Sequence, residues 1–322
     1  MPDKNTVVGV DVGGTKILIG LVERGGKVVS ARRFPMHADS SQATLHSLDC
    51  ALAEFMQALP AGAAPAGVGI GLVGQTNPQA GMWLNSINLH IIQPVPLGKL
   101  IFDQYGLPVA LDNDVHAATL AEMRLGAGKG IPDFVYLNVG TGIAAGLVTN
   151  GQLVRGAANY AGELGHWEIE PDGELCACGQ RGCLESIASG SGILVQVRAR
   201  LSEGEPSSLS EAAYRPDFNA GDVFRAAEAG DRLAAQVGDR AARALGIALT
   251  GLVNLLNPSL IVFGGGVVTD GWLMQRASRW VMEHAMPVAR STLQGIVPSQ
   301  MKPGETGLLG AASLAWDFIP IT

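Results

Sequence analysis

Apolar residues fall into short continuous runs and into longer segments where they recur at helical spacing. The runs at Val7–Val12 and Ile17–Val22 flank a glycine turn, which predicts a β-hairpin. The same two patterns predict the other elements. Short apolar runs predict strands at Gly67–Leu72, Val109–Leu111, Phe134–Val139 and in SLIVFGGG, and helical spacing predicts helices at Ala43–Leu59, Leu97–Tyr105, Val115–Leu125 and Arg232–Leu256. Strands that alternate with helices indicate an α/β architecture.

Two of the predicted hairpins share one plan although they lie far apart in the sequence. GVDVGGTKILIGLV and YLNVGTGIAAGLVTNG both read as strand, polar residue, Val, glycine–threonine turn and strand. Asp11 of the first matches Asn138 of the second. We expect two related α/β lobes, each with a glycine loop at a shared cleft, although a glycine-rich chain can also produce such a similarity by chance.

Composition and charge narrow the class of protein. Of the 322 residues, 47% are apolar and 16% charged, which is ample for a large core. The net charge of −7 argues against nucleic acid as a partner, because phosphate binding needs a basic surface. The start of the chain has no basic segment followed by an apolar run, and no apolar run approaches a membrane span of about 20 residues. We therefore expect a soluble, cytoplasmic protein without a membrane partner.

The first glycine turn carries groups that a simple turn does not need. Asp11 interrupts an apolar strand, and Gly13, Gly14, Thr15 and Lys16 follow it. Backbone N–H groups in such a turn can bind an anion, while Asp11 offers the hard oxygen ligand that Mg²⁺ prefers. The alternative is an ordinary hairpin turn that uses glycine for positive φ. The second turn, Gly140, Thr141 and Gly142, repeats the pattern, so we favour a phosphate site over two plain turns.

The segment Gly69–Gly74 matches G-x-G-x-x-G, but its context does not fit a dinucleotide site. QTNPQAG follows it and cannot open a helix, and no acidic residue ends a second strand at the required distance. The P-loop pattern is absent from the sequence.

Three polar residues, Asp112, Asn113 and Asp114, stand between a predicted strand and a predicted helix. One of them could be a plain helix N-cap. Only one residue is needed for a cap, however, and α/β proteins bind ligands at the carboxyl ends of strands. An Asp here could accept a proton from a substrate hydroxyl, and an Asn beside it could bind a neighbouring hydroxyl.

The most specific pattern is the set His166, Cys176, Cys178 and Cys183. One imidazole and three thiolates make a tetrahedral Zn²⁺ set, and four protein ligands close the site, so the zinc would be structural. The alternative is a group of buried free cysteines. Cys50 lies in a predicted helix and is expected in the core.

Two acidic residues and a glycine triplet complete the candidates. Glu163 and Glu185 flank the cysteine cluster, where a rigid metal knot could hold their carboxylates for sugar hydroxyls; otherwise they are solvated charges. Gly264, Gly265 and Gly266 follow a buried strand, and three bare backbone positions suggest contact with a flat group such as adenine.

Six of these segments follow one another along the chain: DVGGTK, LDNDVHAA, GTGIAAG, GELGH, CACGQRGCLE and VFGGG. In this order, and over nearly the whole chain, they resemble the ROK family of sugar kinases and transcriptional repressors. The resemblance implies the actin-like, hexokinase-type ATPase fold, which is ribonuclease H-like, with two α/β lobes around a cleft. The small lobe would comprise residues 1–115 plus 304–322, with the C-terminal helix returning to it. The large lobe would comprise residues 116–303.

The resemblance also implies roles for individual residues. Asp114 matches the catalytic base, and Asn113, Glu163, His166 and Glu185 match sugar-binding positions. His166 would contact the sugar with one ring nitrogen and zinc with the other. ATP with Mg²⁺ would bind the two glycine loops and the adenosine segment at Asp11, Gly13, Gly14, Thr15, Lys16, Gly140, Thr141, Gly142, Gly264, Gly265 and Gly266.

The chain departs from the family pattern where Val73, His116, Ala144 and Ala145 stand, since kinases of the family often have Pro, Asn and glycines there.

We expect an ATP:hexose phosphotransferase, with glucose favoured and with N-acetylmannosamine, N-acetylglucosamine, allose and fructose open. A homodimer is implied by the resemblance. A sugar-responsive repressor is disfavoured, because the first hairpin starts at Val7 and leaves no room for a helix-turn-helix. A non-catalytic sugar-binding protein is disfavoured because Asp11, Asp114 and both loops are present.

Overall fold

The computed structural model describes residues 5–268, 270–302 and 304–318, and the chain divides into two units. Unit 1 comprises the described residues within Met1–Gly130, Leu153–Ala161 and Gln300–Thr322. Unit 2 comprises Ile131–Gln152 and the described residues within Gly162–Ser299. The predicted lobe boundary between residues 115 and 116 falls inside a helix that belongs wholly to unit 1.

The elements of unit 1 alternate strands and helices along the first 125 residues and end with a helix from the far end of the chain. They are β1 (Thr6–Val12), β2 (Lys16–Glu23), β3 (Val28–Pro35), α1 (Ser41–Gln57), β4 (Val68–Leu72), β5 (Gln75–Asn77), β6 (Met82–Asn85), η1 (Ile87–Leu89), α2 (Leu97–Tyr105), β7 (Val109–Asn113), α3 (Asp114–Leu125) and α10 (Thr306–Phe318).

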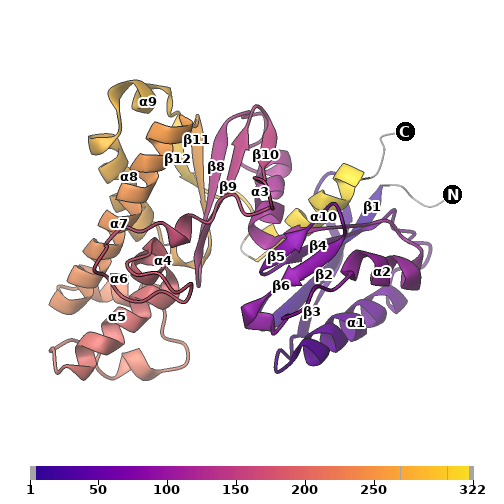
Figure 1. Cartoon of the computed structure of the whole chain (residues 1–322), viewed down its shortest axis with the longest axis horizontal. Helices are drawn as coiled ribbons and strands as arrows, with labels where there is room; N and C mark the ends of the chain where they lie inside the picture. Colours follow the sequence, from indigo (N-terminus) through magenta and orange to yellow (C-terminus); the bar gives the residue numbers. More distant parts are fainter. Residues whose placement is uncertain (1–4, 269, 303, 319–322) are drawn as a thin grey trace. The chain divides into compact units, whose positions relative to one another are not determined.

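Unit 2 holds the remaining elements, and β10 ends in the segment that returns to unit 1. They are β8 (Phe134–Val139), β9 (Ile143–Thr149), β10 (Gln152–Val154), η2 (Leu164–His166), α4 (Leu184–Ala188), α5 (Gly190–Ser202), η3 (Ala212–Tyr214), α6 (Ala220–Glu228), α7 (Arg232–Leu256), β11 (Leu260–Gly264), η4 (Gly266–Val268), α8 (Trp272–His284), α9 (Pro287–Thr292) and β12 (Gly295–Pro298). The long helix α7 packs against α6 and α8 (Figure 1) and supplies much of the buried core of this unit.

Each unit is built on a five-stranded sheet, and the two sheets have matching strand orders. The orders are β3-β2-β1-β4-β7 and β10-β9-β8-β11-β12. In both sheets the central strand pairs antiparallel with the strand that follows it and parallel with the next strand of the sheet. Asp11 and Asn138 therefore occupy the same place at the end of β1 and β8. This topology agrees with the internal similarity seen in the sequence.

Glycines on one face of the unit 1 sheet let α10 approach the strands closely. A Cβ added at Gly69 of β4 would lie 1.8 Å from the Ala311 carbonyl oxygen, and one at Gly9 of β1 would lie 2.7 Å from the Leu308 carbonyl oxygen. The helix packs on β1, β4 and α3 (Figure 1). The G-x-G-x-x-G match thus includes a helix-packing glycine, and β5 and β6 follow it as a two-stranded sheet.

Replacing Gly69 with Ala is expected to lower the free energy of unfolding by roughly 1–3 kcal/mol, because overpacking displaces α10 from the sheet. Gly25→Ala is the matched control, since a Cβ there meets no atom within 4 Å. The measurement is urea denaturation of both variants. Equal midpoints for the two variants would contradict the packing argument.

The predicted helices and strands are all present, with end points shifted by a few residues. The structure also corrects one prediction: Cys50 is exposed, because the buried face of α1 is formed by Thr44, Ser47, Leu48, Ala51, Leu52 and Phe55. Among the described residues, no helix is long and apolar enough to cross a membrane.

Candidate active site

The polar residues at the junction of β7 and α3 have distinct local roles. Asn113 is the N-cap of α3, and its Oδ1 accepts hydrogen bonds from the N–H groups of Val115 at 2.8 Å and His116 at 3.4 Å. Its Nδ2 donates to the Gly74 carbonyl at 3.1 Å. The capping role therefore falls to the amide, and neither carboxylate is needed for it. Asp114 begins the helix, where its carboxylate accepts from the Val115 N–H at 3.0 Å.

The Asp114 carboxyl is held in a site that disfavours its charge. Burial raises the pKa of Asp114 to about 7, and the negative charge of Asp11 adds to the effect. Gly71 of β4 lies opposite Asp11 in the sheet register, and a Cβ on it would come 3.8 Å from the Asp114 Cα. The two carboxyl groups thus flank the same position of β4, where the charge of Asp11 acts on Asp114. A carboxyl with a pKa near neutrality can exchange a proton at physiological pH.

Asp11 lies on the face of the sheet that α10 covers. A Cβ on Gly307, in the first turn of α10, would lie 2.4 Å from the Asp11 carboxyl carbon. Burial raises the pKa of Asp11 to about 6, and the charge of Lys16 opposes this rise. The carboxylate is thus held beside a helix N-terminus, whose backbone dipole favours negative charge.

The turn after Asp11 is open at its tip. The Gly13 N–H donates to the Lys16 carbonyl at 3.0 Å, and Gly14, Thr15 and Lys16 are exposed. Neither Gly13 nor Gly14 has positive φ, and a Cβ on Gly14 would meet no atom within 4 Å. Neither left-handed backbone conformation nor internal packing explains the glycine at the tip. An open backbone tip leaves room for an anion.

The second loop of the sequence pattern lies in unit 2 and contacts Glu185. The Glu185 carboxylate accepts a hydrogen bond from the Ile143 N–H at 2.8 Å. A Cβ on Gly142 would lie 2.4 Å from this carboxylate, and one on Gly165 would lie 3.3 Å away. The glycine at 142 is therefore needed for Glu185 to approach the loop. The Thr141 carbonyl accepts from the Ser191 hydroxyl at 2.6 Å, which ties the loop to α5.

The four residues predicted to bind zinc come together in unit 2. One ligand atom from each of His166, Cys176, Cys178 and Cys183 lies within 4.8 Å of all the others. The Cys178 and Cys183 sulfurs are 3.7 Å apart, and the Cys176 sulfur is 3.7 Å from His166 Nδ1. A tetrahedron with zinc–sulfur bonds of about 2.3 Å has edges of about 3.8 Å. The donor set and its spacing fit a four-coordinate zinc ion.

His166 presents its two ring nitrogens to different neighbours. Nδ1 belongs to the cysteine cluster, while Nε2 is 3.8 Å from the Glu163 carboxylate. Both side chains keep solvent access, with 37% exposed for His166 and 52% for Glu163. The Nε2 and carboxylate positions remain available to polar groups of a ligand.

Packing within unit 2 explains part of the glycine triplet Gly264, Gly265 and Gly266. A Cβ on Gly264 would lie 2.1 Å from the Tyr136 hydroxyl, and Gly265 has φ +92° and packs on the Val139 carbonyl. Only Gly266 has no atom within 4 Å of an added Cβ. Close packing of β11 on β8 therefore accounts for two of the three glycines, which the sequence reasoning had attributed to a flat ligand.

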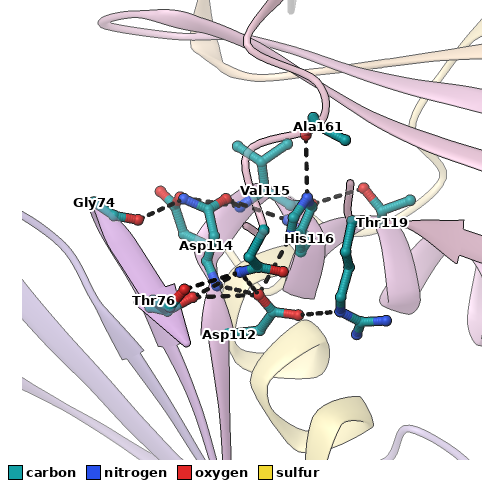
Figure 2. Close-up of polar contacts among 11 residues, drawn as sticks. Gly74, Thr76, Asp112, Asp114, Val115, His116, Thr119 and Ala161 are labelled. Carbon is teal, nitrogen blue, oxygen red and sulfur yellow. Dashed lines mark hydrogen bonds and ion pairs between the residues drawn. The ribbon is translucent and has the colours of Figure 1, made fainter. Parts of the chain in front are cut away.

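Sequence reasoning missed a buried polar network around Asp112, whose side chain has no exposed surface (Figure 2). The Asp112 carboxylate contacts His116 at 3.1 Å, Arg155 at 2.9 Å and Asn159 at 2.8 Å. Thr76 lies 3.5 Å away and also accepts from Asn159 at 2.9 Å. Burial raises the pKa of Asp112, but hydrogen bonds from His116 and Asn159 and the charges of His116 and Arg155 outweigh it, so the pKa lies below its usual value. No motif signals the network, because its members come from β5, β7, α3 and the segment after β10.

The site residues thus fall into two groups. Unit 1 brings together Asp11, the first loop, Asn113 and Asp114. Unit 2 brings together the second loop, Glu185, the cysteine cluster with His166 and Glu163, and the glycine triplet.

Comparison with known proteins identifies the family. The model of the ROK family matches residues 7–317. The chain belongs to the ROK family. A glucokinase from Thermotoga maritima is 33% identical over 314 residues, which cover 97% of each chain. The structure of a ROK family glucokinase from Streptomyces griseus, in complex with glucose and AMPPNP, has a TM-score of 0.78 and 30% identity, covering 97% of this chain and 99% of that one.

Other members of the family are also similar. An N-acetylmannosamine kinase from Shigella flexneri is 31% identical over 311 residues, covering 96% of this chain and 98% of its own. The structure of a ROK family transcriptional regulator has a TM-score of 0.85 and 31% identity, covering 97% of this chain and 78% of that one. The family and the fold expected from the sequence, an actin-like, hexokinase-type α/β ATPase, are confirmed. So is the enzyme class, a sugar kinase.

Proposed function

We propose that this ROK protein transfers the γ-phosphoryl group of ATP to the 6-hydroxyl of an aldohexose, with glucose as the preferred substrate. The observation that carries the proposal is the Asp114 carboxyl, whose pKa is raised to about 7 beside Asp11. A general base works best when its pKa lies near the working pH. The glucokinases among the similar proteins support glucose.

Asp114 is the proposed catalytic base. Its carboxylate orients the 6-hydroxyl and takes the proton as the new O–P bond forms and the bond to the ADP oxygen breaks. Because phosphoryl transfer has a loose transition state, alignment and charge neutralisation contribute more than proton removal. Asn113 has already used its Oδ1 as the helix cap and one Nδ2 hydrogen on Gly74, so its second Nδ2 hydrogen would bind the sugar.

The nucleotide half of the reaction is assigned to the two glycine loops. The first turn from Gly13 to Lys16 is open and lacks positive φ, which suits phosphate oxygens against backbone N–H groups. Asp11 offers the carboxylate that would hold Mg²⁺. Bound there, Mg²⁺ would supply positive charge against the charge that develops on the phosphate oxygens. Thr141 and Gly266 would contact the rest of the nucleotide, together with their neighbouring glycines.

Sugar selectivity is assigned to the groups on the zinc-binding segment. Glu163, His166 Nε2 and Glu185 would bind sugar hydroxyls, and zinc on the three thiolates and Nδ1 would fix their positions. The zinc would be structural, since four protein ligands leave no open coordination position.

Activity is expected to fall with decreasing pH below about 7. Asp114 accepts a proton only when it is ionised. Because its pKa is raised, the carboxylate becomes protonated as the pH falls through about 7, whereas an ordinary Asp becomes protonated near pH 4. The check is kcat/KM for glucose between pH 5 and 9 at constant ionic strength. A plateau that extends to pH 5 would contradict the assigned pKa.

A substrate panel tests the proposed function. ADP release is coupled to a dehydrogenase assay with glucose, N-acetylmannosamine, N-acetylglucosamine, allose and fructose, and the product is identified by phosphorus NMR. We expect the highest kcat/KM with glucose and a 6-phosphate product. A higher value for N-acetylmannosamine would reassign the substrate, and no turnover with any sugar would refute the proposal.

The similarity to a transcriptional regulator favours a second candidate, sugar-responsive DNA binding. The net charge of −7 argues against it. A gel-shift assay with promoter fragments, with and without glucose, decides between the two. We expect no retarded complex.

A further inference from the structure

The segment from Leu153 to Ala161 belongs to unit 1, although the residues before and after it belong to unit 2. Within the segment, the Ala161 N–H donates to the Arg155 carbonyl at 3.1 Å, which closes a loop. Asn159 in this loop has φ +65°, a conformation that Asn tolerates better than most residues. The loop is therefore a defined structure whose attachment to unit 1 needs an explanation.

The attachment is the Asp112 network. Arg155 Nε and Asn159 Nδ2 both bind the buried Asp112 carboxylate, at 2.9 and 2.8 Å. The Asn159 amide also reaches Thr76 at 2.9 Å. A fully buried carboxylate is costly unless it is paired and hydrogen-bonded, so these contacts cannot be lost one by one without penalty. The loop is held to β7 by charge-assisted hydrogen bonds.

His116 extends the attachment to α3. Its Nδ1 lies 3.1 Å from the Asp112 carboxylate, and its Nε2 lies 3.3 Å from the Ala161 carbonyl (Figure 2). Both partners only accept hydrogen bonds, so the ring makes both bonds when each nitrogen carries a proton. The His116 side chain is 4% exposed. His116 thus joins the helix that carries Asp114 to the end of the loop.

Two residues beyond Ala161 the chain reaches Glu163. Gly162 has φ +99° and packs against the backbone of β9, with its carbonyl accepting from the Ala145 N–H at 2.8 Å. Glu163 therefore comes directly after a residue that is bound to β9 and two residues after the end of the clamped loop. Gly162 is the one residue between Ala161 and Glu163, so a movement of Ala161 is expected to be passed on to Glu163.

We propose that His116, Asp112 and Arg155 form a clamp that holds the loop from Arg155 to Ala161 against β7 and α3, and so positions Glu163 for the sugar. The proposal rests on the proposed function, in which Glu163 binds a sugar hydroxyl. His116 and Arg155 are positioning residues, since they act through the loop. The clamp acts on the binding of the sugar and does not change the two glycine loops proposed to bind the nucleotide.

The first test uses His116→Gln and Arg155→Gln in the full chain. Gln at 116 carries both donor hydrogens on one nitrogen, whereas the imidazole reaches the two oxygens from two different nitrogens. Gln at 155 removes the positive charge that pairs with Asp112. Because His116 is buried, Arg155, which is 32% exposed, provides the variant with the smaller risk to folding. We expect each variant to raise the KM for glucose about 3- to 10-fold while the KM for ATP and kcat stay within about twofold.

The second test is hydrogen exchange at the Ala161 amide, without substrate. We expect exchange to become at least about tenfold faster in both variants, because the loop opens more often. The Cys176 amide, bonded to the Gln180 carbonyl at 2.8 Å, should exchange as in the wild type. Arg215→Gln is the matched control, because it removes an Arg from an exposed pair with Asp217 in unit 2.

Unchanged exchange at Ala161 in both variants would overturn the clamp. Faster exchange with an unchanged ratio of the two KM values would overturn its action on the sugar site. Failure of the proposed function is a separate result, seen as wild-type protein that phosphorylates no sugar. The exchange measurement still decides the clamp in that case, since it uses no substrate.

Discussion

Replacing Asp114 with Asn is expected to lower kcat by about 10²- to 10⁴-fold while the affinity for glucose changes little. Asn keeps the shape and the hydrogen bond to the sugar hydroxyl, but it cannot take the proton. The measurement combines kcat from the coupled assay with the dissociation constant for glucose from calorimetry.

Asp103→Asn is the matched control for this variant. Asp103 lies on α2 of the same unit in an exposed pair with Lys99, so its loss should leave turnover unchanged. Turnover of the Asp114 variant close to that of the wild type would remove Asp114 from the role of base.

Asp114→Asn is expected to stabilise the fold at neutral pH although it lowers turnover. A loss of activity that accompanies a gain in stability does not come from unfolding. The folded-state pKa of Asp114 is raised above its unfolded value, so ionisation destabilises the fold as pH rises from about 4 to about 7. Asn carries no charge. At pH 8 the variant is expected to gain roughly 1–3 kcal/mol in free energy of unfolding, and at pH 4 the gain should disappear.

Replacing Cys178 with Ser is expected to remove zinc and to weaken the sugar half of the site. Cys178 is exposed, so the substitution removes a proposed zinc ligand with little change in core packing. We expect loss of about one zinc per chain, at least a tenfold higher KM for glucose, and a melting temperature lower by about 10 °C. Metal analysis, steady-state kinetics and calorimetry measure the three effects.

Cys50→Ser controls for the loss of an exposed thiol, because Cys50 lies on α1 of unit 1 and the cluster belongs to unit 2. Treatment of the wild type with a chelator should reproduce the Cys178 result. Stoichiometric zinc and an unchanged KM for glucose in Cys178→Ser would contradict the structural role of the ion.

Patterns confined to neighbouring residues predicted the fold well. The β1–β2 hairpin and α7 were visible because apolar runs and helical spacing are local properties. Cys50 was misplaced because the periodicity of α1 is weak: Thr44 and Ser47 occupy buried positions through hydrogen bonds to the Leu89 carbonyl and the His37 N–H. When polar residues occupy the buried face of a helix, the apolar pattern of the sequence does not show which face is buried.

The candidate site was predictable where its chemistry lies in short motifs. The residues of the cysteine cluster lie within 18 positions of one another, and one imidazole with three thiolates is a recognisable donor set for zinc. The Asp112 network was not predictable, since Arg155 and Asn159 lie 43 and 47 residues away from Asp112. The glycine triplet shows a further limit. A sequence does not tell whether a bare backbone faces a ligand or, as at Gly264, a neighbouring tyrosine.

The position of α10 in the chain has a consequence for synthesis. This helix covers the glycine-bearing face of the unit 1 sheet and the carboxylate of Asp11, yet unit 2 precedes it in the sequence. On the ribosome, strands β1 and β4 therefore emerge long before their covering helix, and an apolar surface stays exposed throughout translation of unit 2. We expect nascent chains to depend on chaperones during this interval and to acquire catalytic competence only once α10 has packed on the sheet.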